Sequence, residues 1–250
     1  MKTLLWTGAA MGLPTHGQSI VFRWWNYYRV HREAMDVTHF AAFNDGDKNL
    51  PVELFVRMQN ANSPASYDPF SENCLNLVYW PDHIGFGDPP NLHRRGFWRN
   101  VFKAVEVCQQ QDFDRMILIE ADTLIMGPDM LFEIGKTTTG ATAYWCPAHG
   151  IPESSICIFG KDKFQALADF ASDERRRDKG FESGMDWTEV RKHRVGDRYP
   201  EWTQSIPTNA EYCVQVMSWA LLRWGGKLET FRTRHENENA SQSHLPGATG

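Results

Sequence analysis

Residues 115 to 126 read RMILIEADTLIM, a continuous apolar run that is interrupted by two carboxylates. Such a run predicts a strand buried on both faces, which is typical of the parallel sheet of an α/β protein. Glu120 and Asp122 stand two residues apart where this strand ends. Two carboxylates at this spacing can reach one divalent cation if the backbone turns there, and their oxygens prefer hard ions such as Mg²⁺ or Mn²⁺. We therefore expect a metal-assisted site at this strand end.

Strands and helices precede this segment. The hydrophobic patterns predict strands at residues 2–7, 37–43, 52–58 and 75–80, and helices at 17–32 and 94–108. A strand, a helix and a second strand at this spacing predict a parallel unit that binds ligands at the carboxyl ends of its strands. The fold class we expect is α/β, with a Rossmann-like, mostly parallel central sheet flanked by helices. At 250 residues the chain is long enough for one such domain.

The chain that follows predicts a short helix from residue 127, strands at 140–145 and 155–159, and helices at 161–171 and 208–224. Residues 172–200 are highly charged, and the run 174–177 in particular predicts a solvated surface. The last residues, 232–250, are polar and predict a flexible tail.

The composition argues against several classes of function. The formal net charge is -5 and the basic residues are scattered, so we expect no nucleic-acid partner. The five cysteines include no Cys-x-x-Cys pair, which argues against a disulfide framework and a zinc site.

No apolar run approaches the roughly 20 residues of a membrane-spanning helix, although a peripheral membrane contact stays open. Residues 4–11 could be read as a signal peptide, but glycines interrupt them and no clean cleavage site follows, so we expect a buried strand and a cytoplasmic protein.

The segment from Trp98 to Met126 resembles the corresponding part of glycosyltransferases with the GT-A fold, including glycogenin-like enzymes. In that family a helix, a short turn containing Asp, and a strand ending in Asp-x-Asp and then Thr or Val and Leu follow in this order. Here the strand end is Glu120-Ala121-Asp122-Thr123-Leu124, with Glu in place of the first Asp. The likeness extends more loosely over residues 1–160.

The resemblance implies a single GT-A-like domain over residues 1–231. Residues 1–126 would form its nucleotide-sugar-binding half and residues 127–231 its acceptor half. The implied activity is metal-dependent glycosyl transfer from a nucleoside-diphosphate sugar to a hydroxyl group of a glycan or another acceptor. Mn²⁺ or Mg²⁺ would be the cofactor.

The metal ligands follow from the same resemblance. Asp122 would bind the cation, and Glu120 would be a second ligand or contact ribose or a metal-bound water. His244 opens a His-x-x-Gly segment and would be the third ligand. The Lys-Pro-Trp that usually follows in this family is absent, so a tail histidine outside the site is the alternative.

The donor contacts have alternatives of their own. The resemblance assigns Asn44, Asp45 and Asp47 to the base or ribose, although Asn-Asp-Gly is also an ordinary turn sequence. Arg95 and Arg99 would face the diphosphate from a helix N-terminus, where backbone N–H groups favour an anion, or would simply be solvated.

Two carboxylates are candidates on the acceptor side. Glu153 would contact the acceptor or act as general base, unless it is an exposed surface residue. Glu211 would lie near the acceptor hydroxyl at the start of a late helix, but Thr208-Asn209-Ala210-Glu211 is also a good capping box.

Two other functions remain open. A sugar nucleotidyltransferase shares this kind of sheet but should have a basic, glycine-rich loop after the first strand, and residues 8–14 contain glycines without a basic residue. A catalytically silent carbohydrate-binding or scaffold protein could keep the fold without the chemistry. The glycine motifs of P-loop and dinucleotide-binding proteins and the nucleophile elbow are absent.

Overall fold

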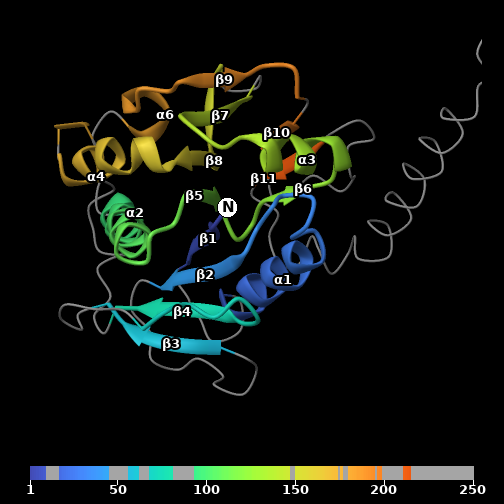
Figure 1. Cartoon of the computed structure of the whole chain (residues 1–250). Coiled ribbons are helices and arrows are strands. Elements are labelled where there is room, and N and C mark those ends of the chain that lie inside the picture. The colour runs from blue at the N-terminus through green and yellow to red at the C-terminus, as the bar shows by residue number, and fades with distance from the viewer. Residues whose placement is uncertain are drawn as a thin grey trace, which may run out of the picture.

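The computed structural model describes residues 1–9, 17–44, 56–61, 68–80, 93–146, 150–173, 175–176, 180–194, 196–198 and 211–214. Three of the expected site residues, Asp45, Asp47 and His244, and the tail over 232–250 lie outside these described residues. The described part of the chain forms two sheets with helices on both faces of the larger one (Figure 1).

The larger sheet has, among the described residues, eight strands in the order β3-β4-β2-β1-β5-β8-β7-β9. Their bounds are β1 Thr3–Ala9, β2 His39–Asn44, β3 Val56–Asn60, β4 Leu75–Tyr79, β5 Arg115–Ile119, β7 Ala141–Cys146, β8 Ile151–Gly160 and β9 Glu189–Arg191. The first five strands in this order are parallel to one another, β8 is antiparallel to both of its neighbours, and β9 is parallel to β7. The fold is therefore the mostly parallel, Rossmann-like α/β fold that the sequence predicts.

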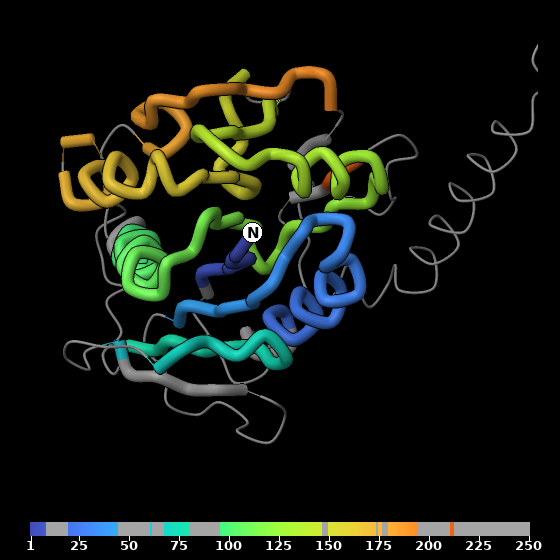
Figure 2. Tube along the Cα trace, viewed as in Figure 1, coloured from blue at the N-terminus to red at the C-terminus, as the bar shows by residue number. Residues whose placement is uncertain are grey.

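Helices cover the two faces of this sheet. They are α1 Gly17–Val30, α2 His93–Gln110, α3 Pro128–Lys136 and α4 Phe164–Ser172, with a short 3-10 helix at Lys161–Lys163 and α6 at Gly180–Gly184. α1 and α3 lie on one face, and α2 and α4 on the other (Figures 1 and 2). Neighbouring residues of β1 point into the two resulting cores, since Leu4 and Trp6 pack with α2 and Leu5 packs with α1. A strand buried on both faces needs such an apolar sequence.

The apolar run over residues 115–126 forms two strands, and the first ends at the carboxylates as predicted. β5 ends at Ile119, and the chain turns before β6 at Leu124–Ile125. The amide of Thr123 donates a hydrogen bond to the carbonyl of Glu120 at 2.9 Å, which closes the turn. β6 then joins a second sheet, in the order β10-β11-β6, with β10 at Gly196–Arg198 and β11 at Tyr212–Val214.

The helix predicted to begin at residue 208 is wrong over the residues that the structure describes. Tyr212 and Cys213 instead pair with Ile125 and Leu124 of β6. This long-range pairing overrides a local helical pattern, because sequence propensity is a weak preference compared with tertiary contacts.

The charged segment over 172–200 is also only partly a solvated surface. Arg175 and Arg176 are exposed, as predicted. In contrast, Phe181 is 2% exposed and belongs to the core, and the side chain of Arg191 is only 11% exposed. Among the described residues, we find no helix that is long and apolar enough to cross a membrane.

Candidate functional site

The carboxyl ends of β1 and β5 meet where the strand order reverses. From β1 the chain leads to β2 on one side, whereas from β5 it leads towards β7 and β8 on the other. In open α/β sheets, ligands bind at this point, outside the carboxyl ends of the strands. The turn that carries Glu120 and Asp122 follows directly on β5 and therefore lies there.

Glu120 is held against the neighbouring strand β8. Its amide donates to the carbonyl of Ser155 at 3.0 Å, and its Oε2 accepts a hydrogen bond from Ser155 Oγ at 2.8 Å. The side chains of Glu120 and Asp122 are both half-buried, so they have access to solvent at the strand end. The carboxylates predicted from the sequence are thus accessible to a ligand above β5.

Because β8 is antiparallel to β5, its beginning lies at the same edge of the sheet. The side chain of Glu153 is completely buried, and its Oε1 accepts a hydrogen bond from the amide of Ser155 at 3.1 Å. Ser155 therefore links Glu153 and Glu120, while Ser154 Oγ donates to Glu182 on α6 at 2.8 Å. The structure brings two predicted site residues together through a serine.

The buried thiol of Cys157 lies close to these carboxylates. Burial raises its pKa well above the ordinary value, and the charges of Glu153, Glu120 and Glu182 raise the pKa further. A thiol in such surroundings stays protonated at neutral pH, and the thiolate is the reactive form. Cys157 is therefore not a nucleophile of this site.

The carboxyl ends of β2 and β4 are joined by a second polar group. The amide of Trp80 donates to the carbonyl of Asn44 at 3.0 Å, and the Trp80 indole donates to Asn100 Oδ1 at 3.1 Å. Asn100 Nδ2 in turn donates to the carbonyl of Phe43 at 3.1 Å. The guanidinium carbon of Arg99 lies 4.2 Å from the centroid of the Trp80 ring, a cation–π contact.

Of the donor residues predicted from sequence, Asn44 and Arg99 therefore lie at this second group rather than beside Glu120. β2 and β1 lie between β4 and β5, so at ordinary strand spacing the end of β5 is about 14 Å from the end of β4, which precedes Trp80, and about 10 Å from the end of β2, which carries Asn44. Nothing is described for the side chain of Arg95. One phosphate could not contact both groups, but an extended ligand could.

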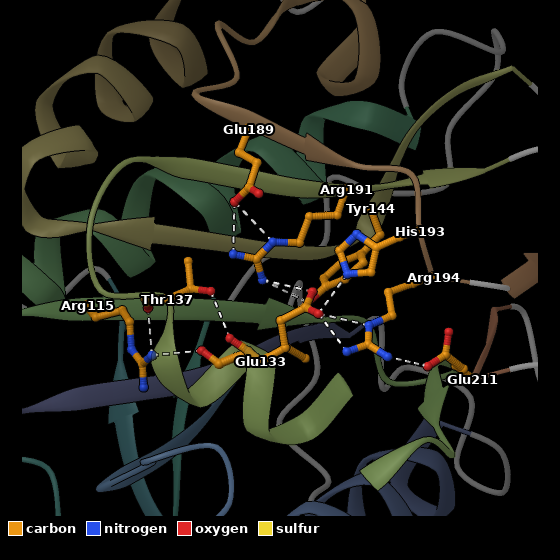
Figure 3. A network of polar contacts seen from close by, with 10 residues as sticks. Arg115, Glu133, Thr137, Tyr144, Glu189, Arg191, His193, Arg194 and Glu211 are labelled. Atoms are coloured by element: carbon orange, nitrogen blue, oxygen red, sulfur yellow. Dashed lines mark hydrogen bonds and ion pairs between the residues drawn. The ribbon is translucent and has the colours of Figure 1, made fainter. Parts of the chain in front are cut away.

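Glu211 lies beside the segment that follows the acidic turn. Its carbonyl accepts hydrogen bonds from the amides of Met126 and Gly127 at 2.6 and 3.0 Å. Its carboxylate accepts one from Arg194 at 2.6 Å, and its side chain is 25% exposed. Figure 3 shows that Arg194 also contacts Glu133 of α3, which links Glu211 to a chain of charged residues.

Glu133 is the centre of this chain. Arg191, His193 and Arg194 all contact its carboxylate (Figure 3). Burial disfavours the charged form, but the hydrogen bonds from His193 and Arg194 and the charges of both arginines outweigh it, so that the pKa of Glu133 is lowered. A cavity of about 500 Å³ opens beside these residues, lined by Asp129, Phe132, Glu133, Lys136, Thr137, Arg191 and Arg194.

The residues at the acidic turn fit a hard divalent cation that also binds a ligand. Carboxylate oxygens from Glu120 and Asp122 are the donor type that Mg²⁺ and Mn²⁺ prefer. Among the described residues, no group of three or more His, Cys, Asp or Glu side chains is arranged to hold a metal ion. Mg²⁺ is usually bound through one or two carboxylates together with substrate phosphates and waters, which is the arrangement that these two residues suit.

Several residues of this region were not predicted from the sequence. Trp80 and Tyr28 are parts of apolar patterns, and only their hydrogen bonds separate them from ordinary core residues. Arg194 falls in the charged segment that predicts a solvated surface. Ser155 has a partial signal, since it lies in the segment of Glu153, but its link to Glu120 depends on the pairing of β5 with β8.

Comparisons with known proteins add little to this geometry. No protein-family model matches the chain, and no curated protein matches its sequence. Among solved structures, a glycosyltransferase involved in the glycosylation of the major capsid of PBCV-1 is similar, with a TM-score of 0.47 and 7% sequence identity. The alignment covers 92% of this chain and 100% of that one. A likeness of this strength carries no argument about function, which has to come from the site itself.

Proposed function

We propose that the chain is a glycosyltransferase of the GT-A type, which transfers a sugar from a nucleoside-diphosphate sugar to an acceptor hydroxyl group. The observation that carries the proposal is the acidic turn at the point where the strand order reverses. Half-buried Glu120 and Asp122 lie at the place where α/β sheets bind their ligands. Two solvent-accessible carboxylates at that place are suited to a cation and a diphosphate rather than to packing.

The donor would extend along the carboxyl edge of the sheet. Its diphosphate would lie above β5 and β1, and its nucleoside would extend over β2 towards Trp80 and Arg99. The separation of about 10 to 14 Å between the acidic turn after β5 and the ends of β2 and β4 supports a long ligand of this kind over inorganic phosphate. Arg99 and Lys103 lie over the ring of Trp80 at 4.2 and 5.3 Å, so this group offers positive charge to an anionic donor.

Asp122 and Glu120 would hold Mn²⁺ or Mg²⁺ together with the diphosphate. The cation supplies compensation for the negative charge of the departing nucleoside diphosphate. Ser155 fixes one carboxylate oxygen of Glu120. The rotamer of Glu120 is therefore set before the donor binds, which lowers the cost of ordering the site.

The acceptor would approach from the side of Glu211. Glu211 is 25% exposed and is bound to Arg194, which also lines the 500 Å³ cavity. This volume is in the range of small-molecule sites. Glu153 is completely buried, so it is less suited to touch an acceptor hydroxyl than Glu211 is. We therefore assign the general base, if the reaction inverts the anomeric centre, to Glu211.

Calorimetric titration of UDP and GDP, with and without Mn²⁺, tests the donor site. We expect the wild-type protein to bind one of the two in a metal-dependent way, and Asp122→Asn to weaken this binding at least tenfold because it removes a charged ligand. Asp169→Asn, an exposed carboxylate on α4, is the matched control and should bind like the wild type.

The outcomes separate the alternatives. If the folded wild-type protein binds neither nucleotide with Mn²⁺ present, the proposal fails for these donors, and the silent carbohydrate-binding or scaffold protein becomes the better interpretation. Binding that persists unchanged in Asp122→Asn would place the nucleotide elsewhere on the molecule.

A further inference from the structure

Two tyrosines of α1 hold the backbone that follows the acidic turn. Tyr28 Oη donates a hydrogen bond to the carbonyl of Thr123 at 2.9 Å and accepts one from the amide of Ile125 at 3.2 Å. Tyr27 Oη donates to the carbonyl of Ile125 at 2.6 Å. Neighbouring side chains of one helix thus make three hydrogen bonds to a segment that lies nearly one hundred residues away in the sequence.

These bonds begin at the residue next to Asp122. The bond from the Thr123 amide to the Glu120 carbonyl spans Asp122 and closes the turn. The Thr123 hydroxyl is buried and, within the described part of the chain, has no hydrogen-bond partner. The Thr123 side chain therefore does not hold the turn through a hydrogen bond, whereas Tyr28 binds the Thr123 carbonyl directly.

The tyrosine rings themselves are fixed by packing. Tyr28 is completely buried, and its ring centroid lies 5.0 Å from that of Tyr27 and 5.7 Å from that of Trp24. Trp24 is 1% exposed and packs edge to face on Phe40 of β2. The hydroxyl groups are thus carried by rings that cannot move far, and α1 acts as a rigid support for the turn.

We propose that Tyr27 and Tyr28 are positioning residues of the cation and donor site. They do not touch the donor; they set the path of the backbone at Thr123 and Ile125, and through it the direction in which the Asp122 carboxylate points. The inference rests on the proposed function, because it takes Asp122 as a ligand. Supporting residues of this kind matter because a site has to be held within a fraction of an ångström.

Tyr28→Phe tests this role with little change to the core. The ring stays in place, and only the hydroxyl that serves Thr123 and Ile125 is lost. Thr38→Val is the control, because the Thr38 hydroxyl likewise donates to a backbone carbonyl and accepts from a backbone amide, both of Thr3 at 2.9 Å. It also contacts Nδ1 of the neighbouring His39 at 2.8 Å. Thr38 precedes β2 and so lies at the opposite edge of the sheet.

For the wild type and both variants, calorimetric titration measures the affinity for Mn²⁺ alone and for UDP or GDP with Mn²⁺. Thermal unfolding measures the stability of the same three proteins. We expect both variants to lose some thermal stability, but only Tyr28→Phe to weaken Mn²⁺ and nucleotide binding, by about tenfold, the lower range for loss of a supporting partner. Tyr27→Phe, which loses the bond to the Ile125 carbonyl, should fall between the wild type and Tyr28→Phe.

Amide hydrogen exchange gives a readout that does not need a ligand. Exchange of the amides from Ala121 to Ile125 should become faster in Tyr28→Phe and stay unchanged in Thr38→Val. Faster exchange with wild-type affinity for Mn²⁺ and nucleotide would overturn the positioning role while the proposed function stands. If the wild-type protein binds neither ligand, the proposed function fails, and the inference fails with it.

Discussion

At the scale of the residue, Arg115 is the most constrained charge that the structure describes. Its side chain is completely buried at the start of β5. The guanidinium donates to five carbonyl oxygens, those of Ile134, Gly135, Thr137, Met35 and Asp36, at 2.7 to 3.2 Å. Burial lowers the pKa of Arg115 to about 10, an effect that the nearby charge of Asp36 partly offsets, so the group is still protonated at neutral pH. Arg115 thus joins the end of α3 to the turn between α1 and β2.

Arg115→Met should cost about 4 kcal/mol of unfolding free energy, because several buried carbonyl groups lose their donor at once. Urea unfolding measures this as a lower midpoint with an unchanged slope. Arg176→Met is the control, since Arg176 is exposed and pairs across the surface with Asp173, and it should change stability by less than about 0.5 kcal/mol. A loss below about 1 kcal/mol in Arg115→Met would mean that the carbonyl groups find other partners.

The sequence predicts some of these residues and not others, for a physical reason. Glu120 and Asp122 can be predicted because carboxylates are unusual at the end of an apolar strand. Arg115 is the first residue of the same strand, where a basic residue is unremarkable. Its role depends on carbonyl groups from two distant turns, and backbone acceptors leave no trace in the sequence.

At the scale of the element, Glu133 joins α3 to the segment after β9. It is 19% exposed and lies among Arg191, His193 and Arg194 (Figure 3). Its pKa is lowered, since the hydrogen bonds and charges of these residues together outweigh burial. A carboxyl group whose pKa is lower in the folded than in the unfolded state stabilises the fold at pH values above its unfolded-state pKa. This stabilisation is lost as the pH falls through the folded-state pKa.

Glu133→Gln should therefore be less stable than the wild type by about 2 kcal/mol near neutral pH. The difference should shrink as the pH falls through and below the ordinary carboxyl range, because the pKa of Glu133 is lowered in the folded protein. Chemical unfolding at a series of pH values measures it. In Glu189→Gln, where the carboxyl is 50% exposed, the change should stay within about 0.5 kcal/mol. A difference that is independent of pH would show that the charge of Glu133 is not what stabilises the contact.

Element boundaries were predicted well wherever one periodicity dominates. α2, β1, β2 and β4 lie close to the predicted residues, because their apolar patterns coincide with their final burial, whereas β3 ends two residues later than predicted. The strand that begins at Arg115 ends at the carboxylates, as predicted, whereas the apolar residues after the turn form β6, which pairs with β11. β11 itself carries a helical pattern, and its pairing partners lie some ninety residues earlier in the sequence.

At the scale of the whole molecule, the larger sheet joins the two predicted halves. Ile119 of β5 pairs with Ile156 of β8, so hydrogen bonds cross from residues 1–126 to residues 127–231 in the middle of the sheet. Both hydrophobic cores also contain residues from the two halves. Leu4 and Phe181 belong to one core, and Leu5 and Tyr212 belong to the other. If one half binds the donor and the other binds the acceptor, the two sites would thus belong to a single folding unit.

A fragment of residues 1–126 should therefore not fold by itself. We expect it to unfold without a cooperative transition, whereas the full chain should give coincident transitions in tryptophan fluorescence and far-ultraviolet circular dichroism. The fragment would leave one edge of β5 unpaired and both cores incomplete. A fragment that melts cooperatively at low concentration would contradict this expectation and indicate two domains.

The central position of β1 has a further consequence for synthesis on the ribosome. β1 is made first, yet one of its two edges pairs with β5, which begins only at Arg115. At ordinary rates of translation, β5 emerges on the order of ten seconds after β2 is complete. During that interval the nascent chain exposes an unpaired apolar strand edge, the type of surface to which chaperones and other copies of the same chain attach.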